Sequence, residues 1–266
     1  MPQETFLVTV PPQQLRLLRG REVTPAHLAY RMGPGPRLLR AGTPARGGWM
    51  VLSDCGFQGL GSRDILCQEI VTECRSREFS GVILDFDRRL PPLEQLAARL
   101  DGLLPHRGLT LAVPEAYGHC TQRARVIIPA AISGGTLRQR LEEAGQQFGR
   151  DRITLSLEAA AEDFLLPSPT GCGAPLSPEQ LAGLRERLRP SVFFSQELCA
   201  RYFTYMENGS GHFVLFDDGD TLKRKTDAAR QSGVTSFLLP WTILPLCAGV
   251  PGFFGGTPPK TNRPAP

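Results

Sequence analysis

Short apolar runs recur along the whole chain, and they restrict its fold more than any other feature. Each run is rich in Val, Ile, Leu or Phe. A continuous apolar run, in contrast to an alternating one, is typical of a strand buried on both faces of a parallel sheet. The sequence therefore predicts eight such strands, at Phe6–Val10, Leu28–Met32, Trp49–Ser53, Val82–Phe86, Leu109–Val113, Arg125–Ile128, Ile153–Leu157 and Phe237–Trp241.

Between several of these runs, apolar residues recur at the spacing of an amphipathic helix. Repeated alternation of strand and helix indicates an α/β architecture with parallel strands. Eight strands in one domain favour a closed (β/α)8 TIM barrel over an open doubly wound sheet, and no glycine-rich phosphate-binding loop follows the first strand. The predicted helices are Ile65–Phe79, Leu93–Leu104, Thr136–Phe148, Pro178–Leu188 and Thr221–Ser232.

Two parts of the chain depart from this alternation. The segment Ala200–Phe216 contains two strand-like runs around Asn208 and Gly209, and Asn-Gly between such runs is a strong hairpin signal. We therefore expect a β-hairpin insertion before the last strand. Residues 248–266 are rich in Gly and Pro, a composition typical of disorder. The predicted organisation is one barrel over residues 1–247 followed by a disordered tail.

The composition argues against several classes of function. The net charge is +4, from 30 Lys and Arg against 26 Asp and Glu. Because the basic residues are scattered among acids, no nucleic-acid partner is expected. The seven cysteines form no C-x-x-C pair and no histidines stand at metal-ligand spacing, so neither a metal nor another cofactor is expected. The odd cysteine count, and the lack of a charged-then-apolar leader at Met1–Pro11, favour free thiols and a cytoplasmic protein.

One uncharged stretch has nearly the length of a membrane span. Residues Ser236–Phe254 carry no charge, and about 20 apolar residues are needed to cross a bilayer as a helix. Pro240, Pro245 and Pro251 would interrupt such a helix, and Phe237–Trp241 has the pattern of a buried strand. We therefore expect no membrane span.

Acidic residues stand at the ends of several predicted strands, where (β/α)8 barrels carry their chemistry. Asp85 and Asp87 are two positions apart on one strand, so both side chains point to the same side, into the barrel mouth. Two carboxylates this close repel, which raises the pKa of one of them as a general acid requires. In the alternative, one caps the next helix and the other pairs with Arg88 or Arg89. Further polar residues at strand ends are Asp54, Glu115, Glu158 and Trp241.

The segment Ser80–Asp87, Ser-Gly-Val-Ile-Leu-Asp-Phe-Asp, resembles a family signature. The chitinase-like glycoside hydrolases of family 18 have D-G-x-D-x-D-x-E at the end of the fourth barrel strand. The resemblance continues in order over about residues 25–245. Its most specific part is similar to the spore-associated branch that acts on peptidoglycan or cortex, which implies a spore-associated location as the alternative to a cytoplasmic one. The other segments that resemble the family are Leu109–Pro114, Arg125–Ile132, Arg152–Leu157, Ala200–Tyr205, His212–Asp218 and Phe237–Trp241.

The resemblance implies a reaction and roles for particular residues. In the family, the glutamic acid that ends the signature protonates the leaving oxygen, while the substrate's own 2-acetamido group attacks the anomeric carbon. The resemblance implies that Asp87 stands at the position of this acid and that Asp85 holds the acetamide. It also implies that Trp241 forms the floor beneath the sugar ring.

This chain departs from the family at most of these positions. Ser80 and Ile83 replace the first two aspartates of the signature, and Asp87 is one methylene shorter than the glutamic acid. Ala131 and Ala160 stand where the family has tyrosines. Proton transfer requires an approach of about 2.6–3.2 Å, and a misplacement of about 1 Å can cost about 100-fold in rate. The sequence therefore indicates a degenerate catalytic motif and does not decide whether the chain is an enzyme.

The leading hypothesis is a barrel that binds an N-acetylglucosamine-containing glycan, chitin or peptidoglycan, with little or no hydrolysis. Its substrate-binding candidates are Trp241, Glu115, Tyr117 and Glu158. One alternative is an active glycosidase that cleaves β-1,4 bonds with Asp87 as general acid, or with Glu115 or Glu158 in its place. The other alternative is a structural scaffold that binds no sugar.

Overall fold

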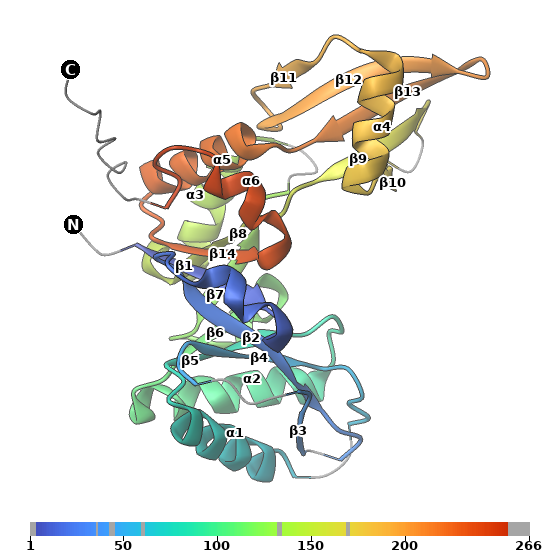
Figure 1. Cartoon of the computed structure of the whole chain (residues 1–266). Coiled ribbons are helices and arrows are strands. Elements are labelled where there is room, and N and C mark those ends of the chain that lie inside the picture. The colour runs from blue at the N-terminus through green and yellow to red at the C-terminus, as the bar shows by residue number, and fades with distance from the viewer. Residues whose placement is uncertain are drawn as a thin grey trace, which may run out of the picture.

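Eight parallel strands form a closed barrel (Figure 1). The computed structural model describes residues 4–254 except 36, 43–45, 60–61, 132–134 and 169–170. The sheet closes because β1 pairs with both β14 and β2. The predicted (β/α)8 fold is confirmed, and each predicted run contributes one strand. The barrel strands are β1 (Thr5–Val10), β2 (Thr24–Met32), β4 (Trp49–Ser53), β5 (Gly81–Asp85), β6 (Thr110–Pro114), β7 (Arg125–Pro129), β8 (Ile153–Ser156) and β14 (Ser236–Pro240).

Apolar side chains fill the inside of the barrel. Alternate residues along each strand face inward, and they form a cluster separate from the one between strands and helices. Trp49 and Gly81 begin neighbouring strands and lie opposite each other. A Cβ at position 81 would lie only 2.6–2.7 Å from the indole ring, so the glycine makes room for Trp49. The interior cluster consists of Leu7, Ala26, Trp49, Val51, Ile83, Ala112 and Leu238.

Helices cover the outer surface of the barrel on two sides (Figure 1). Their apolar faces and the outward-facing strand residues together form the main hydrophobic cluster. On one side lie α1 (Arg63–Arg77) and α2 (Pro91–Leu103), and on the other lie α3 (Leu137–Phe148), α5 (Gly219–Gln231) and α6 (Leu244–Ala248). Shorter elements complete the connections: β3 (Leu38–Arg40), which pairs antiparallel with β2, and the 3-10 helices η1 (Pro12–Leu18), η2 (Pro105–Arg107), η3 (Glu115–Cys120), η4 (Arg150–Arg152) and η5 (Trp241–Ile243).

The unit inserted between β8 and β14 is larger than the predicted hairpin. β12 (Ala200–Glu207) and β13 (Ser210–Phe216) pair antiparallel across Asn208 and Gly209, whose φ angles of 50° and 79° are those that a type I′ turn requires. These strands belong to a five-stranded antiparallel sheet, one face of which packs against α4 (Pro178–Leu188). The predicted helix at 178–188 therefore covers this sheet, not the barrel (Figure 1). The other strands are β9 (Ala161–Leu166), β10 (Ala174–Pro175) and β11 (Phe193–Ser195).

A buried ion pair holds both ends of the insertion against α5. The carboxylate of Asp217, which follows β13, accepts from Lys225 Nζ at 2.8 Å, from the Thr221 hydroxyl at 2.8 Å and from the Ala160 N–H at 3.1 Å. The side chains of Lys225 and Asp217 are 3% and 0% exposed. Because Ala160 precedes β9, this one carboxylate fixes the point where the chain enters and leaves the insertion.

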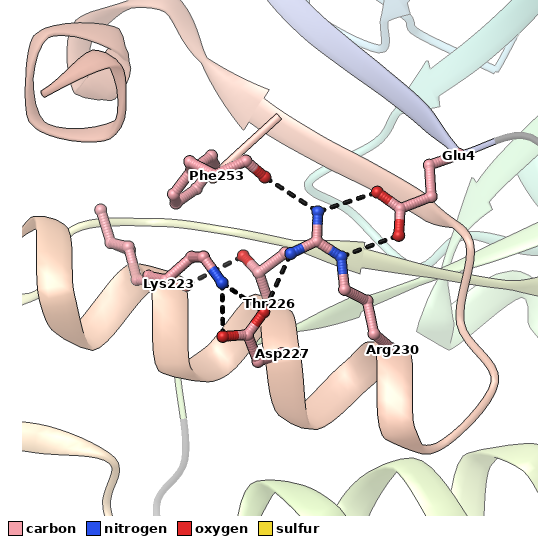
Figure 2. Close-up of polar contacts among 7 residues, drawn as sticks. Glu4, Lys223, Thr226, Asp227, Arg230 and Phe253 are labelled. Carbon is pink, nitrogen blue, oxygen red and sulfur yellow. Dashed lines mark hydrogen bonds and ion pairs between the residues drawn. The ribbon is translucent and has the colours of Figure 1, made fainter. Parts of the chain in front are cut away.

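Arg230 on α5 joins the first and last described segments of the chain (Figure 2). Its guanidinium donates to the carboxylate of Glu4 at 2.7 and 2.8 Å, to Asp227 at 2.9 Å and to the carbonyl of Phe253 at 2.9 Å. Lys223 Nζ donates to both oxygens of Asp227, at 2.5 and 2.6 Å. The barrel is therefore closed at its seam by side chains as well as by the pairing of β1 with β14.

The C-terminal segment folds back onto the barrel. Residues 249–254 form turns, and the buried ring of Phe253 lies 6.1 Å from Phe6 and 5.0 Å from Phe254, measured between ring centroids. The rest of the predicted tail, residues 255–266, lies outside the described residues. In the described part of the chain, no helix has both the length and the apolar character to cross a membrane.

Candidate functional site

A cavity of about 580 Å³ opens at the carboxyl ends of the barrel strands. Barrels of this kind carry their active sites at this end. Among the described residues, the cavity wall contains four carboxylates and no Lys, Arg or His, and most of the remaining wall is apolar. The lining residues are Thr9, Leu28, Val51, Ile83, Leu84, Asp85, Phe86, Asp87, Pro114, Glu115, Ala116, Ile127, Pro129, Ser156, Glu158, Leu238 and Pro240.

Asp85 and Asp87 both lie at this cavity. Asp85 is the last residue of β5, one inward-facing position above Ile83, and Asp87 follows two residues later. Among the described residues, neither carboxylate has a hydrogen-bond or ion-pair partner. Partial desolvation by the cavity wall, and then the negative charges of Asp87 and Asp54, raise the pKa of Asp85. The site therefore holds one carboxyl of increased proton affinity beside a second open carboxyl.

The arginines that follow β5 pair with other acids. The Nε of Arg88 donates to the carboxylate of Asp54 at 2.9 Å, and the Nε of Arg89 donates to Glu94 at 3.1 Å. One alternative from the sequence is that Asp85 or Asp87 pairs with one of these arginines, which would neutralise its charge. The structure shows otherwise, because both guanidinium groups are already engaged.

Asp54 supports the segment that carries Asp87. Its side chain is 2% exposed and accepts from the backbone N–H of Asp87 at 3.3 Å as well as from Arg88. Arg88 also donates to the carbonyl of Phe57 at 3.1 Å, and its own carbonyl accepts from the hydroxyl of Tyr117. Sequence reasoning found Asp54 only as one more acid at a strand end, because its partner comes from a neighbouring loop.

The four predicted substrate-binding residues divide into two pairs. Glu115 and Glu158 line the cavity. Glu115 forms an ion pair with Arg140, whereas Glu158 is exposed and has no partner among the described residues. Tyr117 is 1% exposed, packed edge-on against Phe86, and Trp241 is half-buried against the main hydrophobic cluster. Neither Tyr117 nor Trp241 is among the residues that line the cavity.

The cavity wall provides hydrogen-bond acceptors but few donors. Its carboxylates accept only when ionised, and among the described lining residues the side-chain donors are the hydroxyls of Thr9 and Ser156. Ile83 faces inward where the family signature has an aspartate. Ala131, where the family has a tyrosine, is exposed and has no polar side chain, and Ile132 lies outside the described residues. No group of three or more His, Cys, Asp or Glu in the described chain is arranged to hold a metal ion.

A second cavity, of about 590 Å³, lies outside the barrel between β2, β3 and α1. It also contains acids, but they are engaged with cations. Glu69 pairs with Arg37 at 2.8 Å, and Glu73 pairs with Arg40 at 3.0 Å. Open carboxylates are therefore a feature of the barrel mouth and not of every cavity in this molecule.

Known proteins resemble this chain in structure. No family model and no curated protein matches it. The spore cortex-lytic enzyme SleL of Bacillus cereus superposes with a TM-score of 0.67 at 15% identity, over 92% of this chain and 74% of SleL. A chitinase from Chromobacterium violaceum superposes with a TM-score of 0.65 at 16% identity, over 93% of this chain and 99% of the chitinase. A class V chitinase from Pseudomonas fluorescens superposes with a TM-score of 0.66 at 13% identity, over 95% of this chain and 98% of that chitinase. The predicted chitinase-like barrel fold is thereby confirmed.

Proposed function

We propose that this barrel binds an N-acetylglucosamine-containing glycan, of the chitin or peptidoglycan kind, at the cavity in its mouth, with little or no hydrolysis. The observation that supports the proposal is the cavity at the strand ends, which Asp85 and Asp87 both line. Ser80 and Ile83 stand where the family signature has its first two aspartates, and Asp87 is one methylene shorter than the glutamic acid. The spore cortex-lytic enzyme among the similar structures supports a role at a spore cortex or cell wall.

Loss of hydrolysis is supported by two changes in chemistry. The shorter side chain of Asp87 draws the acid away from a leaving oxygen, which costs about 100-fold in rate if the displacement is about 1 Å. Ala131 offers no hydroxyl to the developing charge, and loss of one such donor costs about 100- to 1,000-fold. Together these changes remove most of the rate enhancement that a substrate-assisted glycosidase achieves.

The alternative of an active glycosidase is favoured by a specific observation. The raised pKa of Asp85 and the lack of a partner for Asp87 within the described residues leave a carboxyl of increased proton affinity and a second, open carboxyl at the same cavity. In an active enzyme Asp87 would donate the proton, and Glu115 or Glu158 could take its place.

Two measurements on the same protein distinguish these functions from a scaffold that binds no sugar. We expect saturable binding of a tetramer of N-acetylglucosamine by titration calorimetry, and no release of reducing sugar from the tetramer or from peptidoglycan above that of the Asp87→Asn variant. Release that disappears in Asp87→Asn would establish a glycosidase. Absence of binding, with Glu142→Gln as a surface-charge control of equal folding, would establish a scaffold.

A further inference from the structure

We infer that the sugar unit held in this cavity carries a free, protonated amine in place of its N-acetyl group. This inference rests on the proposed function, because it specifies which unit of an amino-sugar polymer enters the cavity. A polymer with some de-N-acetylated units would place one of them between Asp85, Asp87 and Glu158, with the adjoining sugar units outside the cavity.

The first reason is the charge of the wall. The chain as a whole has a net charge of +4, yet the described lining residues contain four carboxylates and no basic side chain. Only Glu115 has a cation beside it, Arg140. A concave site lined by charges of one sign raises the local concentration of ligands of the opposite sign. The cavity therefore favours a cation over a neutral sugar.

The second reason is the kind of hydrogen bond that the wall can make. An ammonium group has only donors and a carboxylate only acceptors, so the two satisfy each other with charge-assisted hydrogen bonds. An acetamide brings a carbonyl oxygen that needs a donor. Thr9 and Ser156 supply the only side-chain hydroxyls among the described lining residues, and Ile83 and Leu238 supply none. A buried carbonyl without a donor weakens binding.

The third reason is that the buried acids of the described chain, unlike the acids at the mouth, already have partners of their own. Asp217 has Lys225, and Asp101 accepts from the backbone N–H groups of Gln122, Arg123 and Ala124. At the mouth, Asp85, Asp87 and Glu158 lack partners within the described residues. Grouped carboxylates repel one another, and a bound ammonium removes that repulsion.

The test compares two tetramers of equal length, one of glucosamine and one of N-acetylglucosamine, by titration calorimetry at low salt and about pH 6, where a sugar amine is protonated. We expect the glucosamine tetramer to bind at least about tenfold more tightly. The preference should shrink to about threefold or less in Asp85→Asn and Asp87→Asn, and also in the wild type at high salt. The control variant Glu142→Gln, exposed on α3, should keep the full preference.

The outcomes separate this inference from the proposed function. Equal or tighter binding of the N-acetylglucosamine tetramer overturns the inference and leaves the proposed function intact. If neither tetramer binds, the proposed function is overturned. A glucosamine preference that survives both asparagine substitutions, in variants whose thermal unfolding shows a folded protein, also overturns the inference because the amine is then held elsewhere.

Discussion

At the scale of single residues, Asp85 is in an environment that disfavours its charge. A carboxyl whose pKa is higher in the folded than in the unfolded chain binds protons more tightly when folded. The free energy of unfolding therefore falls as pH rises from the ordinary value of 3.8 through the raised pKa, and the loss persists at neutral pH. Neutralising this side chain should stabilise the protein.

We predict that Asp85→Asn raises the free energy of unfolding at pH 7 by about 0.5 kcal/mol, a small gain because solvent at the cavity mouth screens the charge. The gain should disappear below about pH 4, where the wild-type carboxyl is protonated in both states. Urea unfolding at the two pH values measures it. A loss of stability at pH 7 would show that Asp85 has a stabilising partner after all.

Gly81 belongs to the signature segment Ser80–Asp87 and also packs against Trp49 inside the barrel. The Gly81→Ala methyl would overlap the indole of Trp49, and overpacking of a core costs about 1–3 kcal/mol. On α2, a Cβ at Gly102 would have no other heavy atom within 4 Å, so Gly102→Ala should be neutral or stabilise by up to about 1 kcal/mol. Thermal unfolding of both variants checks the difference, and equal effects would contradict the close packing of Trp49 on Gly81.

At the scale of elements, the barrel strands could be predicted because each is buried on both faces and therefore reads as a continuous apolar run. Strand β9 could not be predicted, because Ala161–Leu166 is half-exposed and its partner β13 is about fifty residues away in the sequence. A hairpin signal at Asn208 located β12 and β13 but could not show that other strands join them, because strand pairing between distant segments leaves no local pattern.

The candidate site shows the same division. The inward direction of Asp85 follows from the alternation of side chains along β5, so the sequence could predict it. Tyr117 and Trp241 follow the ends of β6 and β14, where the chain continues as the 3-10 helices η3 and η5. Beyond the end of a strand, the alternation of side chains no longer predicts which way a side chain points, and neither residue is among those that line the cavity.

The attachment of the insertion depends on Lys225. Removing one partner of a buried ion pair leaves an uncompensated charge and costs about 3–5 kcal/mol, so Lys225→Met should destabilise the protein by that amount. Lys223 lies on the same helix and pairs with the more exposed Asp227, so Lys223→Met should cost less than about 1 kcal/mol. Urea unfolding compares the two, and similar losses would mean that burial of the Asp217 pair is unimportant.

At the scale of the whole molecule, Arg230 on α5 links Glu4, which precedes β1, to the C-terminal segment at Phe253 (Figure 2). Its guanidinium also lies over the rings of Phe6 and Phe237, 5.9 and 5.8 Å from their centroids. We predict that Arg230→Ala lowers the free energy of unfolding by about 2–4 kcal/mol. Arg138→Ala, which breaks an exposed pair with Glu142, should cost less than about 0.5 kcal/mol. Equal losses in thermal unfolding would contradict a role for Arg230 at the seam.

The central proposal is a barrel that binds a glycan at its mouth without an intact catalytic motif. A crystal structure of the protein with an amino-sugar tetramer tests this most directly. We expect an uncleaved chain whose inner unit lies in the barrel mouth against Asp85 and Asp87. A tetramer bound only elsewhere, or an empty mouth at saturating tetramer, would contradict it.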